Sequence, residues 1–132
     1  MAKITRGNPK NLKNVRASVY NHYVRLDNPG SLIFLSGQLS RDAEGNLIGP
    51  GDMAEQTRQA IRNMRTVLEA AGGTLEDIVS TTVYTTDIRL FKEIVQARIE
   101  FFAASLPTST MVEVNHLADP GLLVEIQAIA AL

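Results

Sequence analysis

Apolar and polar residues recur along this chain with two different periods, and the periods separate predicted strands from predicted helices. Residues 32–35 are all apolar and lie between a Pro-Gly and a Ser-Gly dipeptide, which is typical of a short buried strand. A strand-like pattern also begins at Val19. Further strands are predicted where apolar and β-branched residues are concentrated, at residues 78–86, 111–114 and 122–129.

Two segments show the helical spacing of three and four residues. In residues 53–71 one face is apolar, Asp52 stands where a capping carboxylate is expected, and Glu55 follows at the spacing of a reciprocal cap. A Gly-Gly pair then supplies a left-handed stop. A second helix is predicted after Asp87, and its apolar face carries Phe91, Ile94, Val95, Ile99 and Phe102.

The predicted order of elements is strand, strand, helix, strand, helix, strand, strand. Two helices can cover only one face of such a sheet, because a helix is about 10 Å wide and strands lie about 5 Å apart. Strict alternation in the last strand places Glu125 and Gln127 on one face and an apolar set on the other, namely Leu122, Val124, Ile126 and Ala128. We therefore expect a homo-oligomer that buries the uncovered face and holds polar groups in its seams.

The length of 132 residues suits one domain, which we place at residues 17–132. Residues 1–16 are polar and are interrupted by Gly7 and Pro9, so we predict a flexible N-terminal arm. No apolar stretch approaches the roughly 20 residues of a membrane helix, and no apolar run follows the basic N-terminus as it would in a signal peptide. We expect a cytoplasmic protein without a membrane partner.

Composition removes several kinds of chemistry. The chain has no Cys, which excludes disulfides, thiolate metal sites and cysteine nucleophiles. Its two histidines, His22 and His116, lie far apart in the sequence and form no metal-ligand pattern, so we predict no metal. The formal net charge is -1, without the basic excess that neutralises phosphates. We therefore expect a small-molecule partner and no nucleic acid.

Several stretches coincide, in the same order, with those of a known protein family. They include Ser36-Gly37-Gln38, Leu68-Glu69-Ala70-Ala71-Gly72, Thr81-Thr82-Val83-Tyr84, Phe101-Phe102, Val112-Glu113-Val114 and Val124-Glu125-Ile126-Gln127-Ala128. Across about residues 23–130 the chain thereby resembles the Rid (YjgF) family. The resemblance implies a chorismate-mutase-like α+β subunit with a mixed six-stranded sheet, two helices on one face, and a homotrimer with three clefts between neighbouring chains.

The resemblance also implies an activity. Competent members hydrolyse reactive enamines and imines, such as 2-aminoacrylate, to the keto acid and ammonia without a metal or organic cofactor. In those members an arginine two residues after Pro107 anchors the substrate, and here that position is Ser109, in an ungapped match. Serine offers one neutral hydrogen bond, whereas arginine offers a planar fork of donors with a permanent charge. The substitution argues against ordinary 2-imino-acid deamination.

Other positions match the family's cleft. Tyr23 matches the tyrosine that flanks the ligand, and Ser36 and Gly37 match residues that line the cleft. Glu125 matches the glutamate credited with holding the hydrolytic water, and it is our candidate catalytic residue. A carboxylate inside an apolar strand also needs a hydrogen-bonding or charged partner. The structural alternatives remain open: Tyr23 as a packed strand residue, and the Ser-Gly pair as a turn at the strand end.

Arg98 falls inside the apolar stripe of the second predicted helix, so its guanidinium needs a partner. One interpretation is a buried or snorkelling arginine paired with a carboxylate such as Glu125 or Glu100. The other is that Arg98 reaches the cleft beside Val95 and supplies the missing cation from a different backbone position. Val95 and Met111 stand where competent members often carry asparagine and cysteine, so the predicted pocket is more apolar.

Two functions are therefore predicted. The first is a divergent RidA-like deaminase or hydrolase that acts on a small enamine or imine at intersubunit clefts, with Glu125 as the group that activates water. The alternative is a catalytically silent homotrimer that binds a small metabolite in the same clefts, as a sensor or a sequestering protein. A ribonuclease role, which the family name sometimes carries, is disfavoured by a charge balance near zero.

Overall fold

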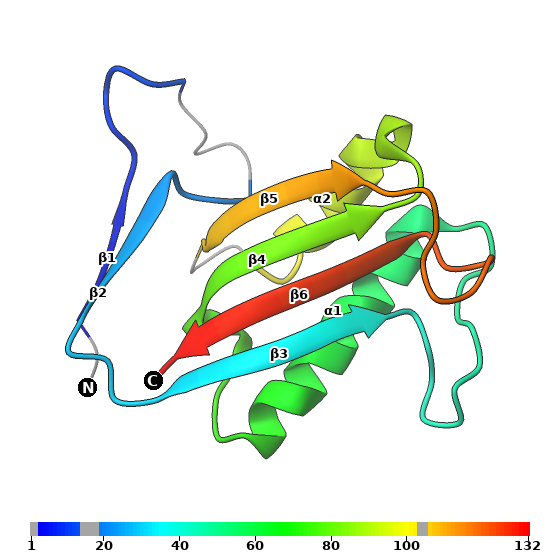
Figure 1. Ribbon diagram of the computed structural model, residues 1–132, viewed down its shortest axis with the longest axis horizontal. Helices are drawn as coiled ribbons and strands as arrows, with labels where there is room; N and C mark the ends of the chain where they lie inside the picture. The colour runs from blue at the N-terminus through cyan, green and yellow to red at the C-terminus, as the bar shows by residue number, and fades with distance from the viewer. Residues whose placement is uncertain (1–2, 14–18, 103–105) are drawn as a thin grey trace.

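The computed structural model describes residues 3–13, 19–102 and 106–132. Within these residues the chain forms six strands and two α-helices (Figure 1). In chain order they are β1 (Lys3–Gly7), β2 (Tyr23–Asp27), β3 (Leu32–Leu39), α1 (Met53–Ala70), β4 (Ile78–Thr85), α2 (Phe91–Ile99), β5 (Thr108–Glu113) and β6 (Val124–Ala131). The predicted α+β class is confirmed.

The larger sheet has four strands in the order β3-β6-β4-β5. Strands β4 and β5 run parallel, while β6 is antiparallel to both of its neighbours. Both helices lie on one face of this sheet, as predicted (Figure 1). Strands β3 and β5 therefore form the two opposite edges of the sheet, a placement that decides where the candidate site residues can meet.

The six strands do not form one sheet. Strands β1 and β2 make a separate antiparallel pair, in which Ile4 lies opposite Leu26, and this pair stands to one side of the larger sheet (Figure 1). The segment Lys3–Gly7 falls in the predicted flexible arm, yet it is a strand. With Ile4 as its only large apolar side chain, this segment carries too little alternation to predict a strand from sequence.

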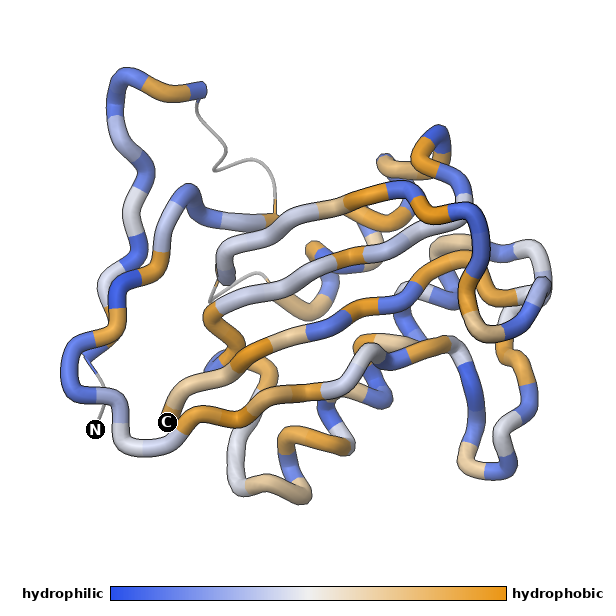
Figure 2. The backbone as a smooth tube through the Cα atoms, viewed as in Figure 1, coloured by the Kyte–Doolittle hydropathy of each residue, from blue (hydrophilic) through white to orange (hydrophobic). Residues whose placement is uncertain are grey.

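The alternation predicted for the last strand is confirmed in β6. Its apolar residues Val124, Ile126 and Ala128 are buried in the core beneath the helices, whereas Glu125 and Gln127 point to the uncovered face. Figure 2 shows the corresponding alternation of hydrophobic and hydrophilic positions along β6. The uncovered face thus places a carboxylate and an amide within a largely apolar strand.

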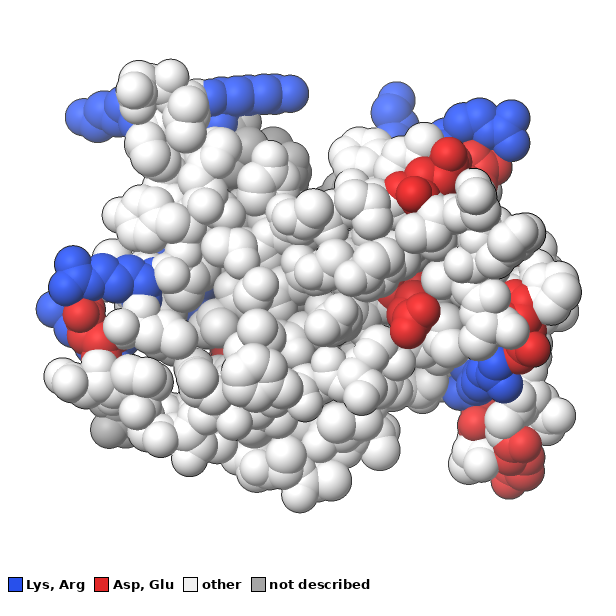
Figure 3. Space-filling model, in the orientation of Figure 1, with Lys and Arg blue, Asp and Glu red and all other residues white. Residues whose placement is uncertain are grey.

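The uncovered face of the sheet is apolar at the β3 edge. Phe34 is 71% exposed there, and Leu32 is exposed beside it. Figure 3 shows charged side chains gathered mainly at the rim of the molecule, with a largely uncharged middle. An apolar surface of this kind, bordered by charges, is typical of a protein–protein contact.

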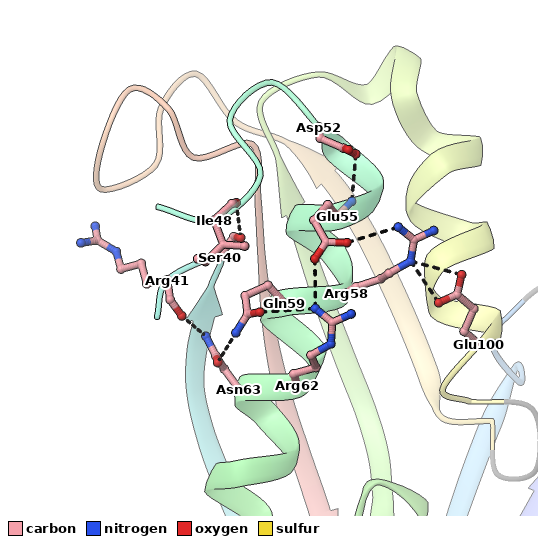
Figure 4. Close-up of polar contacts among 10 residues, drawn as sticks. All are labelled: Ser40, Arg41, Ile48, Asp52, Glu55, Arg58, Gln59, Arg62, Asn63 and Glu100. Carbon is pink, nitrogen blue, oxygen red and sulfur yellow. Dashed lines mark hydrogen bonds and ion pairs between the residues drawn. The ribbon is translucent and has the colours of Figure 1, made fainter. Parts of the chain in front are cut away.

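Helix α1 begins and ends as the sequence predicts. The Asp52 carboxylate accepts a hydrogen bond from the backbone N–H of Glu55 at 3.0 Å, and Gly72 takes a positive φ of 87° just beyond the helix. Glu55 does not serve as the predicted reciprocal cap. Its carboxylate instead accepts hydrogen bonds from Arg58 and Arg62 on the next turns (Figure 4).

Helix α2 is shorter than the predicted apolar stripe. Asp87 caps a one-turn 3₁₀ helix, Ile88–Leu90, that leads into it. Two residues expected on the buried face, Phe91 and Ile99, are exposed, which corrects the prediction. The buried side of this helix is instead formed by Ile94, Ala97 and Arg98.

Candidate functional site

A cavity of about 210 Å³ lies between α2, β5 and the segment that precedes β2. Three of the sequence-predicted residues meet in its wall, namely Arg98, Ser109 and Met111, together with the neighbouring Val95. The remaining lining residues, which the sequence did not single out as site residues, are Val19, Tyr20 and Phe91.

The guanidinium of Arg98 is fixed by neutral groups. The residue is 1% exposed, its Nη1 donates to Ser109 Oγ at 3.0 Å, and its Nη2 donates to Thr81 Oγ1 at 3.0 Å. The ring of Phe102 lies with its centroid 5.8 Å from the guanidinium carbon. Arg98 Nε has no hydrogen-bond partner in the part of the chain that the structure describes. A buried N–H donor is therefore left unused at this position.

The register of the sheet explains why two hydroxyls meet this cation. Thr81 and Ser109 are direct partners in the parallel pairing of β4 with β5, and α2 packs over the same face. Thr81 also donates its own hydroxyl hydrogen to the Thr108 carbonyl at 3.1 Å. Its oxygen is thereby oriented to accept from the guanidinium. This residue could have been found from sequence only with the strand register in hand.

Neither carboxylate predicted as a partner of Arg98 is paired with it. Glu100 accepts from Arg58 Nε at 3.0 and 3.2 Å, and Glu125 lies on the face of the sheet away from the helices. Among the described residues, no carboxylate lies within ion-pair distance of Arg98. Burial lowers the pKa of Arg98 to about 10, so the side chain is charged at neutral pH.

A second group of predicted residues lies at the other edge of the sheet. Gly37 sits at an irregularity in the pairing of β3 with β6, and a Cβ at this position would collide with the Glu125 carboxylate. The absence of a side chain at Gly37 thus lets Glu125 lie across β3. Ser36 is exposed beside them, and Gly37 also lines an open depression with Asn63.

One chain does not bring the two groups together. Ser109 lies on β5 and faces the helices with Arg98, whereas Glu125 lies on β6 and faces the opposite side. Strands β5 and β6 are separated by β4, so they lie about 10 Å apart across the sheet. The cation and the candidate catalytic carboxylate could approach one another only across a contact between chains.

Tyr23 lies outside both groups. It begins β2, is 45% exposed, and its ring covers Gly7 of the paired strand. The tyrosine that lines the cavity is Tyr20, which stands three residues earlier. Nothing in the local sequence distinguishes the two rings, because the turn that precedes β2 decides which of them faces α2.

The described residues offer no metal centre. No group of three or more His, Cys, Asp or Glu side chains is arranged to hold an ion in the described part of the chain. None of the helices within residues 3–13, 19–102 and 106–132 combines the length and the apolar character of a membrane-spanning segment.

Known proteins share the sequence of this chain over most of its length. Residues 13–132 match the family described as Endoribonuclease L-PSP. A RutC family protein of Pyrococcus horikoshii is 37% identical over 108 residues, which cover 82% of this chain and 85% of the relative. The chain belongs to the Rid/YjgF family.

Solved structures of Rid/YjgF proteins share the fold. YyfB from Yersinia pestis, described as a Rid family protein of unknown function, superposes with a TM-score of 0.90 at 29% identity and covers 98% of each chain. Rv2704 from Mycobacterium tuberculosis superposes with a TM-score of 0.70 at 35% identity, and the match covers 98% of this chain and 100% of the other. The resemblance inferred from sequence, and the YjgF-type subunit it implies, are confirmed.

Proposed function

We propose that this Rid/YjgF protein hydrolyses a small anionic imine or enamine without a cofactor, in clefts between neighbouring chains of a homotrimer. The observation that carries the proposal is the buried guanidinium of Arg98. It stands within hydrogen-bond distance of Ser109, the position where competent relatives carry their arginine, and it has no carboxylate partner among the described residues. A buried charge held only by hydroxyls retains a strong preference for an anion.

The proposed reaction needs an anchor and a water. Arg98 holds the carboxylate of the substrate, while Ser109 and Tyr20 border it. Water adds to the carbon of the protonated C=N bond as Glu125 accepts its proton, which gives a neutral carbinolamine. The carbinolamine nitrogen takes up that proton, Glu125 accepts the hydroxyl proton as the C–N bond breaks, and the carbonyl compound and ammonia leave, the ammonia carrying this last proton away as ammonium. An enamine enters the same sequence because protonation at carbon converts it to the protonated imine.

The cleft must be completed by a second chain. Within one chain Arg98 and Glu125 lie on opposite faces of the sheet and near opposite edges, so Glu125 would be supplied by a neighbour. The exposed Phe34 and Leu32 give the uncovered face a reason to be buried in an assembly. A closed trimer forms three such clefts from identical contacts.

The first test measures ammonia release from 2-aminoacrylate or 2-iminopropionate generated in the assay. Wild-type protein is expected to accelerate release above the uncatalysed rate, and Arg98→Gln and Glu125→Gln are each expected to reduce the acceleration about 100-fold or more. The two variants are then unfolded, mixed in equal amounts and refolded together. If one cleft takes Arg98 from one chain and Glu125 from the next, about a quarter of the clefts are intact.

Recovery of about a quarter of the wild-type rate would support a cleft shared between chains. Mixtures that stay as inactive as the single variants, although mass spectrometry shows mixed trimers, would contradict it. A wild-type rate equal to the uncatalysed rate would remove the hydrolase proposal altogether.

The alternative is a catalytically inactive protein that binds a small metabolite, and the apolar residues beside Arg98 favour it. Val95 and Met111 give the wall beside Arg98 no polar group that could take part in proton transfer. In that case a 2-oxo acid would bind in an Arg98-dependent manner while ammonia release stayed at the uncatalysed rate. A ribonuclease function is not proposed, because a net charge of -1 provides no basic track for a polyanion.

A further inference from the structure

Strand β3 is an unprotected edge of the larger sheet. It pairs with β6 on one side, and no strand of the described residues pairs with it on the other (Figure 1). Its sequence, LIFLSGQL, contains no charged residue and no proline, two features that usually keep an edge strand from pairing. Leu32 and Phe34 are exposed on its uncovered face. A further strand would satisfy the free backbone groups of β3 and cover these side chains.

The two-stranded ribbon formed by β1 and β2 also lacks a neighbouring strand. Its two strands contact each other far more than they contact any other helix or strand. An isolated ribbon of this kind is at best marginally stable, and a third strand or a helix is normally needed. Ile4 and Leu26 face one another across the ribbon, and Val24 lies on the same side, which makes that side apolar. The outer edge of β2 has no partner strand in the part of the chain that the structure describes.

Three hydrogen bonds hold the ribbon away from β3 of its own chain. Asn21, two residues before β2, donates its backbone N–H to the Pro107 carbonyl at 2.8 Å and its side-chain Nδ2 to the Leu106 carbonyl at 2.7 Å. Arg6 Nε donates to the same Leu106 carbonyl at 3.1 Å. Residues 106–107 precede β5, which is the edge of the sheet opposite β3 (Figure 1). The ribbon could pair with its own β3 only if these bonds were broken.

The connection between β2 and β3 also directs the two strands apart. Gly30 and Ser31 extend the pairing of β3 with β6, because Gly30 donates to the Leu132 carbonyl at 3.0 Å and Ser31 accepts from the Leu132 N–H at 2.9 Å. The chain turns at Asn28, whose φ of 52° lies in the left-handed region. No pairing joins β2 to β3, although only residues 28–31 separate them. A short hinge of this kind favours the exchange of a strand between chains.

We infer that β2 of one chain pairs with β3 of a neighbouring chain, so that exchanged ribbons close the trimer. None of the three hydrogen bonds to residues 106–107 has to break for this pairing. The strands run antiparallel, which is the more stable arrangement, and the apolar side of the ribbon continues the core beneath α1. The inference rests on the proposed function only for the number of chains and for the cleft that they share.

Strand exchange brings the two halves of the proposed cleft together. In its own chain, β2 begins at Tyr23, three residues or about 10 Å after Tyr20, which lines the cavity with Arg98. Antiparallel pairing places this beginning of β2 near the end of the neighbour's β3, where Gly37 lies against Glu125. The exchanged strand thereby spans the gap between the cation of one chain and the carboxylate of the next.

Engineered disulfides test the pairing directly, because the chain has no native cysteine. Arg25 lies in the middle of β2 on the same side as Tyr23, and Phe34 and Ser36 lie on the uncovered face of β3. The double variants Arg25→Cys with Phe34→Cys and Arg25→Cys with Ser36→Cys allow for two registers. In a ring of exchanged ribbons, one of them should oxidise to a covalent trimer. On a non-reducing denaturing gel the mass would rise from 14.4 kDa to about three times that value.

Thr5 supplies the matched control. It lies opposite Arg25 on β1 and therefore one strand further from the neighbour's β3. When Thr5→Cys replaces Arg25→Cys in both double variants, the protein should remain monomeric on the same gel. Phe34→Cys alone should also remain monomeric, because it forms a disulfide only where two β3 strands meet. Under reducing conditions, size-exclusion chromatography and circular dichroism confirm that each variant folds and assembles as wild type does.

Four results would overturn the inference. Oxidised monomers without free thiols would show that β2 pairs with β3 of its own chain. Cross-links through Thr5→Cys would assign the contact to β1 instead of β2. Cross-links through Phe34→Cys alone would mean that two β3 strands pair with one another. Free thiols in both Arg25→Cys variants, in protein that assembles as wild type does, would show that β2 and β3 do not meet.

The size of the covalent product and the rate of turnover separate this inference from the proposed function. Covalent dimers without free thiols would retain the strand exchange and remove the trimer. Covalent trimers from a protein whose wild type releases ammonia at the uncatalysed rate would retain the exchange and remove the hydrolase. Wild-type hydrolysis together with oxidised monomers would retain the enzyme and remove the exchange.

Discussion

Two sets of arginines on the two helices are held in opposite ways. On α1, Arg58 and Arg62 share the Glu55 carboxylate, and Arg58 also reaches Glu100, so each cation has an anionic partner (Figure 4). On α2, Arg98 is buried among hydroxyls, with no carboxylate partner among the described residues and its Nε unused. Arg58 thus links α1 to the end of α2 at the surface, whereas Arg98 keeps its charge available to a ligand.

The pKa values follow the same division. Hydrogen bonding by Glu100 raises the pKa of Arg58 above its ordinary value, while burial lowers the pKa of Arg98 to about 10. Paired cations near water are stabilised by their partners, and a buried cation without one opposes folding. A protein retains such an arrangement more readily if a ligand supplies the missing anion. The comparison therefore points to Arg98 as a binding residue and to Arg58 as a structural one.

The largest expected effect comes from removing one cation of each kind. Arg98→Gln is expected to lower kcat/KM for imine hydrolysis about 100-fold, because the substrate carboxylate loses its charged partner. Arg58→Gln is the matched control and is expected to stay within about twofold of wild type, because its charge is already paired at the surface. Steady-state ammonia release measures both. Equal losses in the two variants would remove the distinction between them.

Introducing an arginine at Ser109 on β5 should give the second largest effect, a loss of stability. Ser109 Oγ lies 3.0 Å from Arg98 Nη1, so Ser109→Arg would force two guanidinium groups into one buried space. We expect it to lower the free energy of unfolding by about 1–3 kcal/mol through overpacking and charge repulsion. The control Gln59→Arg adds an arginine next to Glu55 on α1 and is expected to be nearly neutral. Chemical denaturation compares the two.

The double variant Ser109→Arg with Arg98→Ala completes this test. It has one cation in the cavity and more space, so both stability and binding of 2-oxo acids should recover. If binding instead falls to the level of Arg98→Ala alone, the cavity requires the cation on α2 specifically.

Some features of the fold and of the site can be predicted from the sequence, and others cannot. The helices, the β6 alternation and the family were predictable because periodicity and contiguous motifs report them directly. The burial of Arg98 was also predictable, since it falls in an apolar stripe. Its partners were not, because Thr81 and Ser109 are brought together by a strand register that no local pattern specifies.

Contacts between distant segments also explain the other places where the structure differs from the sequence-based predictions. Ile4 alone gave no strand signal for β1, which forms because β2 lies opposite it. The choice of Tyr20 over Tyr23 in the cavity wall depends on one turn in the chain. Glu125 was correctly placed on the uncovered face by alternation, but its contact with Gly37 required the irregularity in β3 pairing. Contacts between distant segments were therefore the part that sequence reasoning could not reach.

Replacing each arginine by methionine should change the free energy of unfolding differently at Arg98 and at Arg58. Arg98→Met replaces a buried charge with an apolar side chain of similar length, so we expect an increase of about 1–2 kcal/mol in the free energy of unfolding without ligand. Thr81 remains bonded to the Thr108 carbonyl, and Ser109 still faces the cavity. Arg58→Met removes a paired surface cation and should not stabilise the protein. A destabilised Arg98→Met would show that the guanidinium has a structural role.

The pH dependence of that difference follows from linkage. Below about pH 10 Arg98 is charged in both the folded and the unfolded chain, so the advantage of Arg98→Met is constant. Above about pH 10 the folded chain releases the proton before the unfolded chain does, because the pKa is lowered in the folded chain, and the penalty in wild type declines. Thermal unfolding of both proteins should therefore give a constant gap from pH 7 to 9, which begins to narrow near pH 10.

The smallest effect is expected for the surface network itself. Glu100→Gln leaves Arg58 with Glu55 as its remaining partner, so Tm should fall by no more than about 3 °C. Because these side chains are partly exposed to solvent, the difference should shrink as salt is raised. The gap between wild type and Arg98→Met should be nearly independent of salt, because Arg98 is buried. Equal salt dependence in the two cases would mean that solvent screens Arg98 as it screens Arg58, and the contrast between the helices would be lost.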